Sequence, residues 1–324
     1  MEVRIATFNI FWFPSSTFIG NSRSVEDLDK LREVIKRLDA DILVFQEILD
    51  LQALENLLSL IPDRSYSLRD QDGNWAASGA EKPNDLKVPI AFDSNKLELL
   101  EAGRALLAGQ SPASWGRRDP VAARFRPIGG GTPLTVIGVH LKSGILTEGA
   151  EAETPDDEIR IEEMENLTNW IKTLAPITPS GQPRPANEST VLIGDFNAIR
   201  GNVALKPLLS DAELSKWSWP QPRFASAMSP STVEVNLPLK ERWTTHLDRE
   251  VIDHVIVSPE VKLVEGPWVY AFDYDDSWLQ AANVTKDWLE QSGYTFKKGN
   301  NLKAVENLHR ISDHRPVRVI VELT

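Results

Sequence analysis

A carboxylate and an imidazole stand side by side near the end of the sequence, as Asp313 and His314. An Asp-His pair by itself is common. Here, however, polar residues recur at the ends of other apolar, strand-like segments of the chain: Asn9, Glu47, His140, Asp195, Asn197 and Asp253. Apolar strands need no acids, amides or imidazoles at their ends, so we expect these side chains to converge on one pocket.

The chemistry that these residue types favour is catalysis with a hard divalent cation. Carboxylates, amides and histidines together suit Mg²⁺ or Mn²⁺ acting on a phosphate. The sequence contains no cysteine, which excludes a thiolate ligand and a disulfide framework. We therefore predict Mg²⁺ as the cofactor, with Mn²⁺ as the alternative.

Asp195 and Asn197 follow the apolar residues 191–193 and are separated by one residue. In an extended chain alternate side chains point the same way, which would make the two face one site. The carboxylate could then accept a proton from water while the amide donates to a phosphoryl oxygen. The alternative is an Asx turn after a buried strand.

Asp253 lies inside the apolar residues 251–257, where alternation places it on the face opposite Ile252 and His254. A buried aspartate needs a partner, and an imidazole that it orients is a recurring one.

Two further candidates have plain structural alternatives. His140 and the nearby Lys142 would bring an imidazole and an ammonium together, although a strand-end histidine is often structural and a lysine often solvated. Glu47 is either a metal ligand or a charge at the start of a helix.

The elements that must position these residues alternate between strands and helices. Ser24 and Asp27 form a capping-box pattern ahead of a helix, and residues 51–58 and 161–174 have apolar residues at helical spacing. Strands are predicted at residues 3–8, 42–45, 89–92, 97–100, 121–125 and 134–140. This order predicts an α/β or α+β sandwich with helices outside. Because the candidate residues are scattered from Asn9 to His314, we predict a single domain over residues 1–324.

Composition limits the remaining choices. With 324 residues and 41% hydrophobic content, the chain can bury a full core. Its formal net charge of -12 disfavours a passive polyanion-binding surface but leaves local basic patches open. We find no leader pattern and no apolar run long enough to cross a bilayer. We therefore expect a soluble monomer, with the cytoplasm favoured and export open if a leader has been removed.

Taken in order, these segments resemble the endonuclease/exonuclease/phosphatase superfamily, which contains pancreatic-type DNases, abasic-site endonucleases, inositol polyphosphate phosphatases and bacterial sphingomyelinases. The resemblance covers nearly the whole chain, through residues 7–9, 46–47, 138–143, 194–197, 252–253 and 312–317. It implies a four-layered sandwich of two central mixed β-sheets flanked by helices, with a divalent-metal site at one rim.

The resemblance also implies roles for the acids and for the last histidine. Glu47 and Asp313 would be metal ligands, with Asn9 close by. Asp195 would activate the attacking water. His314 would stabilise the pentacovalent state, oriented by Asp253.

For the phosphate, the resemblance implies contacts from Asn197 and His140. Arg118 belongs to a segment that runs near the site in the family, although it could simply pair with Asp119. Lys142 is the second basic candidate for a substrate contact.

These roles predict a metal-dependent phosphoric ester hydrolase in which water attacks phosphorus directly. A nuclease acting on DNA is favoured. The alternative is a phosphatase or phosphodiesterase acting on a lipid or small molecule of inositol phosphate or sphingomyelin type, and a more remote one is an inactive binding protein of the same fold. Two departures count against the nearest subgroups: Phe11 replaces the acid of members specialised for abasic DNA, and the disulfides usual in secreted DNases cannot form.

Two segments are candidates for substrate-specific additions. The first is the acidic loop at residues 148–158, continued by Glu162, Glu163 and Glu165. It is either a solvated acidic surface or a gate against long polyanions. The second is the aromatic-rich residues 265–310, which would form either a substrate wall or a satellite core under a long loop.

Overall fold

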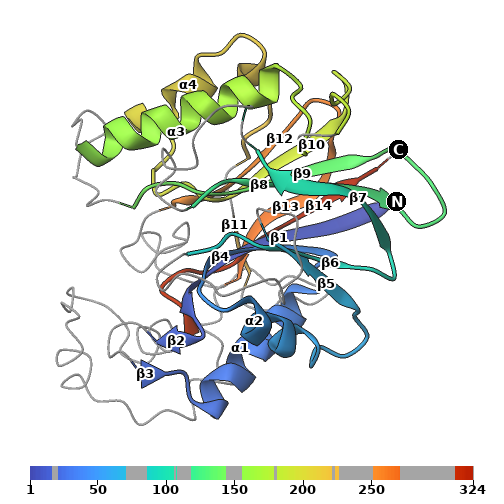
Figure 1. The fold of residues 1–324 in the computed structure, drawn as a ribbon, viewed down its shortest axis with the longest axis vertical. Helices are drawn as coiled ribbons and strands as arrows, with labels where there is room; N and C mark the ends of the chain where they lie inside the picture. The colour runs from blue at the N-terminus through green and yellow to red at the C-terminus, as the bar shows by residue number, and fades with distance from the viewer. Residues whose placement is uncertain are drawn as a thin grey trace.

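The computed structural model describes residues 1–16, 21–70, 86–105, 107, 118–143, 155–178, 181–220, 223–225, 251–270 and 311–323. These residues form two β-sheets packed face to face, with helices on the two outer faces (Figure 1). The four-layered sandwich expected from the sequence is therefore confirmed.

The larger sheet has seven described strands and contains both chain ends. Its order is β11 (Arg223–Ala225), β13 (Lys262–Tyr270), β14 (Val317–Glu322), β1 (Glu2–Phe13), β4 (Ile42–Ile48), β6 (Ile90–Asp93) and β5 (Tyr66–Arg69). Helices α1 (Val25–Leu38) and α2 (Leu51–Leu58) cover its outer face (Figure 1). A small hairpin of β2 (Ser15–Ser16) and β3 (Asn21–Ser22) follows β1.

The smaller sheet has five described strands. Its order is β12 (Asp253–Val257), β10 (Ser189–Asp195), β9 (Leu134–His140), β8 (Val121–Pro127) and β7 (Leu97–Arg104). Helices α3 (Pro155–Lys172) and α4 (Lys206–Leu209) cover its outer face (Figure 1). Two 3₁₀ turns, Val203–Leu205 and Leu214–Lys216, flank α4.

Three hydrophobic layers fill the spaces between the four structural layers. The middle one is built from both sheets and is rich in valine and isoleucine. At Gly138 the sheets approach so closely that an added Cβ would lie 2.5 Å from a methyl of Val44 and 2.9 Å from one of Val121. The absence of a side chain at this position therefore lets the two sheets pack together next to His140.

Local sequence signals for the helices are mostly confirmed. Ser24 and Asp27 form the predicted capping box at the start of α1. Helix α3 begins at Pro155, six residues before the first apolar residue at helical spacing. The first turn of a helix favours proline and acids, which do not contribute to an apolar periodicity.

The polar ends of the strands gather at one edge of the sandwich. Strands β1 and β4 run parallel, and so do β9 and β10, in a register that pairs His140 with Asp195. Asp253 pairs with Asp195 on its other side. The chain termini lie together at the opposite edge, where Met1 N donates to Leu323 O at 2.8 Å (Figure 1). Within the described residues, no helix combines the length and the apolar character needed to cross a bilayer.

Gly194 provides a test of how closely β9 and β10 pair beside the site. Its φ is +147°, and a Cβ there would collide with the backbone carbonyl of Val139. We expect Gly194→Ala to lower the free energy of unfolding by about 2 kcal/mol or more, because backbone strain and overpacking add.

Gly201→Ala is the matched control. Gly201 also has a positive φ, of +101°, but no atom lies within 4 Å of the added Cβ. This variant should lose about 1 kcal/mol from strain alone. The measurement is urea unfolding of both variants, and equal losses would show that the Val139 carbonyl imposes no steric limit.

Candidate functional site

The polar side chains converge because they continue the inward-facing series of the strands. In β1, Val3 and Ile5 face the middle hydrophobic layer, and Asn9 follows on the same face. In β10, Val191 and Ile193 lead in the same way to Asp195. Alternation likewise directs His140 and Asp253 inward from β9 and β12. The site is therefore the end of the inter-sheet layer.

His314 lies at the centre of the site, between two carboxylates. Its Nδ1 donates to Asp253 Oδ2 at 2.8 Å, and its Nε2 lies 3.7 Å from Asp195 Oδ2. Burial disfavours the imidazolium, but the negative charges of Asp253 and Asp195 outweigh burial and hold the pKa of His314 well above its usual value. The expected pairing of Asp253 with His314 is present.

Asp195 is held on both of its oxygens. Asn9 Nδ2 donates to Oδ2 at 3.0 Å, and the backbone N–H of Asn197 donates to Oδ1 at 2.8 Å. Burial raises the pKa of Asp195 to about 6, and the charge of Asp253 adds to the rise while His314 opposes it. The strand ends at Asp195 and Asn197 has a φ of 46°, so an Asx turn brings these two residues together, rather than the extended geometry assumed from the sequence.

Glu47 reaches the site because its backbone departs from strand geometry. Alternation in β4 would turn Glu47 towards the helices, but its φ of 60° redirects the side chain. Its Oε1 lies 3.5 Å from His140 Nε2 across the two sheets. Burial and repulsion from Asp313 raise the pKa of Glu47 to about 7.

Two groups of side chains here could hold a metal ion. Donor atoms of Asp195, Asp253 and His314 lie within 4.8 Å of one another. In that group, however, the raised pKa of His314 already places a proton and a positive charge between the carboxylates. Glu47 and Asp313 repel each other, and Glu47 Oε2 is buried without a hydrogen-bond partner among the described residues. This second pair fits a divalent cation better, because the ion would relieve both conditions.

Asn9 ties the two sheets together. While its Nδ2 bonds Asp195, its Oδ1 accepts from Phe11 N at 2.9 Å. The backbone carbonyl of Asn9 accepts from Ser312 Oγ at 2.5 Å, and Ser312 Oγ accepts from His314 N at 3.0 Å. The end of β1 and the turn before β14 are therefore held in one arrangement.

Arg118 is directed to the site. Its Nη1 lies 3.1 Å from His140 Nε2 and donates to Leu141 O at 3.1 Å, and its Nη2 donates to Ser143 Oγ at 3.2 Å. Asp119, the alternative partner, forms an ion pair with Arg104 at 2.5 Å. Burial and the charges of Arg118 and His314 hold the pKa of His140 well below its usual value, so His140 is neutral and its Nε2 accepts from Arg118.

Lys142 is engaged by partners outside the cluster of His314, Asp195 and Asp253. Its Nζ donates to Ser143 O at 2.6 Å and pairs with Asp156 at 3.2 Å. Of the two basic residues expected to contact substrate, Arg118 is therefore the one that the structure brings to the centre of the site.

Two buried residues support the site without any signal in the sequence. Arg23 is 6% exposed and donates through Nη2 to Ile10 O, Phe11 O and Ile311 O at 2.6, 3.0 and 2.9 Å. It joins the segment after Asn9 to the segment before Asp313. A single arginine ahead of a helix cap gives no indication of such long-range partners.

His254 is the second supporting residue. Its Nε2 donates to Ala198 O at 2.9 Å, and its ring packs edge-on against Phe196 and Trp219. These contacts hold the turn that contains Asn197. Burial lowers the pKa of His254 to about 4.

The acidic and aromatic additions are described only in part. Residues 148–154 lie outside the described residues, whereas Asp157 and Glu163 are buried and Glu158, Glu162 and Glu165 are exposed. A uniformly solvated acidic surface is therefore wrong for Asp157 and Glu163. In the aromatic segment, Tyr270 is buried and Trp268 packs against the same hydrophobic layer beneath α1 and α2. Residues 271–310 lie outside the described residues.

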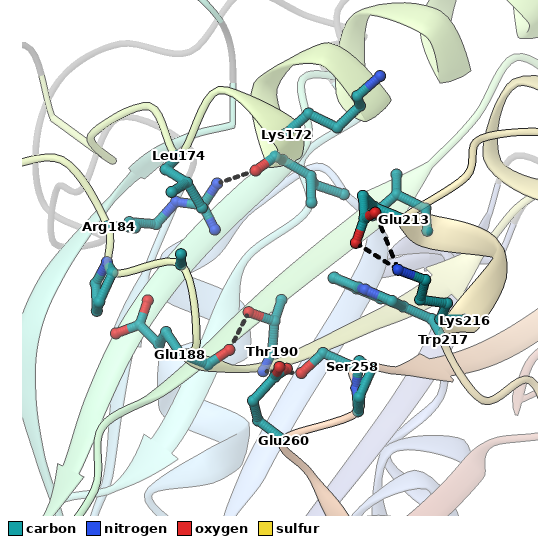
Figure 2. A pocket seen from close by; sticks show the side chains of 15 residues that line it. Lys172, Leu174, Arg184, Glu188, Thr190, Glu213, Lys216, Trp217, Ser258 and Glu260 are labelled. Atoms are coloured by element: carbon teal, nitrogen blue, oxygen red, sulfur yellow. Dashed lines mark hydrogen bonds and ion pairs between the residues drawn. The ribbon is translucent and has the colours of Figure 1, made fainter.

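A cavity of about 300 Å³ lies at the other end of β10, lined by Thr190, Trp217 and Ser258 among others (Figure 2). Thr190 is five residues from Asp195, or about 17 Å along the strand. Basic side chains at the cavity are already engaged: Lys172 pairs with Asp211, Lys216 with Glu213, and Arg184 bonds carbonyls at the end of α3. This cavity is separate from the polar centre.

Comparisons with known proteins identify a family and a shared fold. A model of the Endonuclease/Exonuclease/phosphatase family matches residues 6–314. No protein of curated function matches the sequence at a significant level. Among solved structures, the chain is similar to an endonuclease/exonuclease/phosphatase from Bacteroides vulgatus, with 18% identity, a TM-score of 0.58 and coverage of 100% of both chains.

Two other solved structures share the fold at similar sequence identity and TM-score. The human nocturnin catalytic domain with bound sulfate is 16% identical, with a TM-score of 0.57 and coverage of 100% of this chain and 95% of that chain. A mannosyl-6-phosphatase from Bacteroides thetaiotaomicron VPI-5482 is 18% identical, with a TM-score of 0.56 and coverage of 99% of each chain. Identities this low establish the shared fold alone.

The pKa of His254 leads to a prediction about stability in acid. Because this pKa is about 4 in the folded protein and 6.5 ordinarily, the unfolded chain binds more protons between these pH values. The contribution of His254 to the free energy of unfolding should therefore be lost as pH falls from 6.5 to 4, by up to about 3 kcal/mol. His254→Gln can still donate to Ala198 O but cannot titrate, so urea unfolding at several pH values should show the wild-type advantage shrinking in acid. Parallel pH profiles would contradict this expectation.

Proposed function

The chain belongs to the endonuclease/exonuclease/phosphatase family, and on that premise we propose that it hydrolyses a phosphate ester with water activated by Asp195. Members of this family are phosphoric ester hydrolases. The observation that carries the proposal is the position of His314 between Asp253 and Asp195. A general base and a cationic hydrogen-bond donor stand side by side in this arrangement, and hydrolysis of a phosphate ester uses both.

We assign Asp195 as the general base. With a pKa of about 6, its carboxylate is mostly ionised at neutral pH yet basic enough to accept a proton from water. Asn9 and Asn197 hold the two oxygens of Asp195 in place. Loss of the Asn9 side-chain amide should misalign the base more than it changes its charge.

His314 has the complementary task. Its Nδ1–H is held by Asp253, which orients the ring and leaves Nε2–H as a donor. Because the pKa of His314 is raised well above its usual value, the ring carries a positive charge at neutral pH. We assign this donor to a phosphoryl oxygen that gains charge during the attack.

Phosphate contacts are assigned to Asn197, His140 and Arg118. Neutral His140 accepts a hydrogen bond from Arg118, so it sets the direction of a planar guanidinium suited to phosphate. The side-chain nitrogen Nδ2 of Asn197 donates to Leu141 O at 2.9 Å, the same carbonyl that accepts from Arg118.

We propose Mg²⁺ as the cofactor, with Mn²⁺ able to replace it, and assign Glu47 and Asp313 as its ligands with Asn9 nearby. When bound, such an ion supplies positive charge that neutralises the developing phosphoryl charge. The unpartnered Glu47 oxygen and the repulsion between the two carboxylates support this assignment.

For the substrate we propose DNA. A phosphodiester carries a single negative charge at the scissile phosphate. Among the described residues, Arg118 is the arginine that bonds His140 in the site, and its single positive charge matches that phosphate. A second candidate, a small or lipid phosphate ester, is favoured by the net charge of -12 and by exposed Glu158, Glu162 and Glu165, which repel a long polyanion.

A substrate panel tests both. It contains plasmid, abasic duplex, single-stranded DNA, sphingomyelin, inositol phosphates and bis-p-nitrophenyl phosphate, each with Mg²⁺ or chelator. We expect the highest kcat/KM on DNA, falling steeply with salt as each neutralised phosphate adds roughly 0.9 to the slope. Preference for a small ester with little salt dependence would favour the second candidate. If none of the substrates were hydrolysed, the proposed hydrolase activity would be wrong.

Replacement of the catalytic pair should separate chemistry from folding. We expect Asp195→Asn and His314→Ala each to lower kcat by at least about 10²-fold, the scale for losing a base or a charge-stabilising donor. Asp253→Asn should act in the same direction because it leaves His314 misoriented. Circular dichroism provides the folding control, and a folded His314→Ala enzyme with near-native kcat would remove His314 from the mechanism.

Removing the Glu47 carboxylate should stabilise the protein without metal and abolish its stabilisation by added metal. In chelator at pH 7.5, Glu47→Gln should raise the free energy of unfolding by about 1 to 3 kcal/mol, because a neutral amide replaces a carboxylate whose pKa is raised to about 7. Added Mg²⁺ or Mn²⁺ should stabilise the wild type but not this variant. Exposed Glu98→Gln on β7 is the control. Equal stabilisation of all three proteins by the ions would exclude Glu47 as a ligand.

A further inference from the structure

Helix α3 carries three charged side chains on its buried face, three residues apart. Asp157, Arg160 and Glu163 are 2%, 1% and 1% exposed. Charged residues are almost never buried to this extent without partners. Glu162 and Glu165 of the same helix are exposed, so solubility is already provided without the buried three.

Two of these side chains form hydrogen bonds with the backbone of Lys142, and the third holds one of them in place. Glu163 Oε2 accepts from Lys142 N at 2.8 Å, and Arg160 Nη1 donates to Lys142 O at 2.8 Å. Asp157 holds Arg160 through an ion pair of 2.6 Å. Both polar backbone groups of Lys142, two residues after His140, are therefore fixed by α3.

The grip on the Lys142 N–H extends to the preceding carbonyl. This N–H and the carbonyl of Leu141 belong to one planar peptide unit, in which they point in opposite directions. The Leu141 carbonyl accepts from Arg118 Nη1 at 3.1 Å and from Asn197 Nδ2 at 2.9 Å. Holding the N–H therefore sets the direction of the oxygen that both side chains share, and linked hydrogen bonds also polarise one another.

We propose that Glu163 is a positioning residue, which holds Arg118 and Asn197 in place through the peptide between Leu141 and Lys142. The inference rests on the proposed function, because it concerns two of the three groups assigned to the phosphate. Glu163 acts through an acceptor oxygen at hydrogen-bond distance. Burial raises the pKa of Glu163 to about 8, so the contact does not depend on a negative charge at neutral pH. An acidic gate would need an exposed side chain, whereas Glu163 is buried and faces the backbone.

Two conservative variants separate the hydrogen-bond contact from the carboxyl group that makes it. Glu163→Gln loses the ionisable carboxyl group but keeps an acceptor oxygen at the same reach, so kcat/KM should stay within about 3-fold of the wild type, because the positioning that sets the rate is kept. Glu163→Asp keeps the carboxyl group but is one methylene shorter, so it should release the peptide and lower kcat/KM about 10- to 100-fold, as displacements near 1 Å do. Glu162→Asp and Glu165→Asp are the matched controls and should leave kinetics unchanged.

Binding of inorganic phosphate provides a readout that a purely structural role would not move. By calorimetry with Mg²⁺ present, the dissociation constant for phosphate should rise in Glu163→Asp and stay near the wild-type value in Glu163→Gln. In an Arg118→Met background, Glu163→Asp should weaken phosphate binding by a smaller factor, because part of its effect passes through Arg118.

The outcomes that overturn the inference are distinct from those that overturn the function. Equal phosphate affinity and equal kcat/KM in Glu163→Asp and the wild type would remove the positioning role while leaving the enzyme intact. A loss in Glu163→Gln together with wild-type values in Glu163→Asp would assign the effect to the ionisable carboxyl group and overturn the contact. If the wild type hydrolysed no phosphate ester, the proposed function would fail, but the ranking of the variants in phosphate binding would still decide the role of Glu163.

Discussion

The burial of four carboxylates at one edge of the sandwich is the constraint on which the rest of the site depends. Glu47, Asp195, Asp253 and Asp313 are each 7% exposed or less. Ionised groups removed from water are costly unless charges or hydrogen bonds compensate them. Protonated His314 compensates Asp253 and Asp195, and two amides bond Asp195, but Glu47 keeps an unpartnered oxygen. The uncompensated part of the cluster is where a cation fits.

At the opposite end of the larger sheet, another buried carboxylate has a lowered rather than a raised pKa. Asp41 is 1% exposed, yet it accepts hydrogen bonds from Arg64 and Lys96 at 2.6 Å each. Burial favours its neutral form, but these bonds and one from Arg4 N outweigh burial and hold the pKa of Asp41 below its usual value. Asp41 is therefore a stable anion with a structural role. The raised pKa values of Asp195 and Glu47 instead leave these two groups able to exchange a proton or bind an ion.

Close packing of the two sheets makes this arrangement specific. Three key contacts cross from one sheet to the other: Asn9 to Asp195, Glu47 to His140, and His314 to Asp253. Buried groups outside the centre fix these crossings, since Arg23 joins the segments beside Asn9 and Asp313, and Glu163 grips the segment after His140. A rigid support of this kind is what a site needs when small displacements cost activity.

The sequence by itself indicated strands β1, β4, β6 to β10 and β12, the main helices, the capping box of α1 and the polar residues at the strand ends, but not strands β5 and β13. These features are local, since apolar alternation and helix caps are written in neighbouring residues. Tertiary structure decided which groups became partners and what charge they carry. Arg118 turned to His140 because Arg104 pairs with Asp119, Glu163 was buried within an acidic helix, and a positive φ brought Glu47 into the site. Register between strands distant in the chain, together with burial, sets these outcomes, and neither is visible in a single segment of sequence.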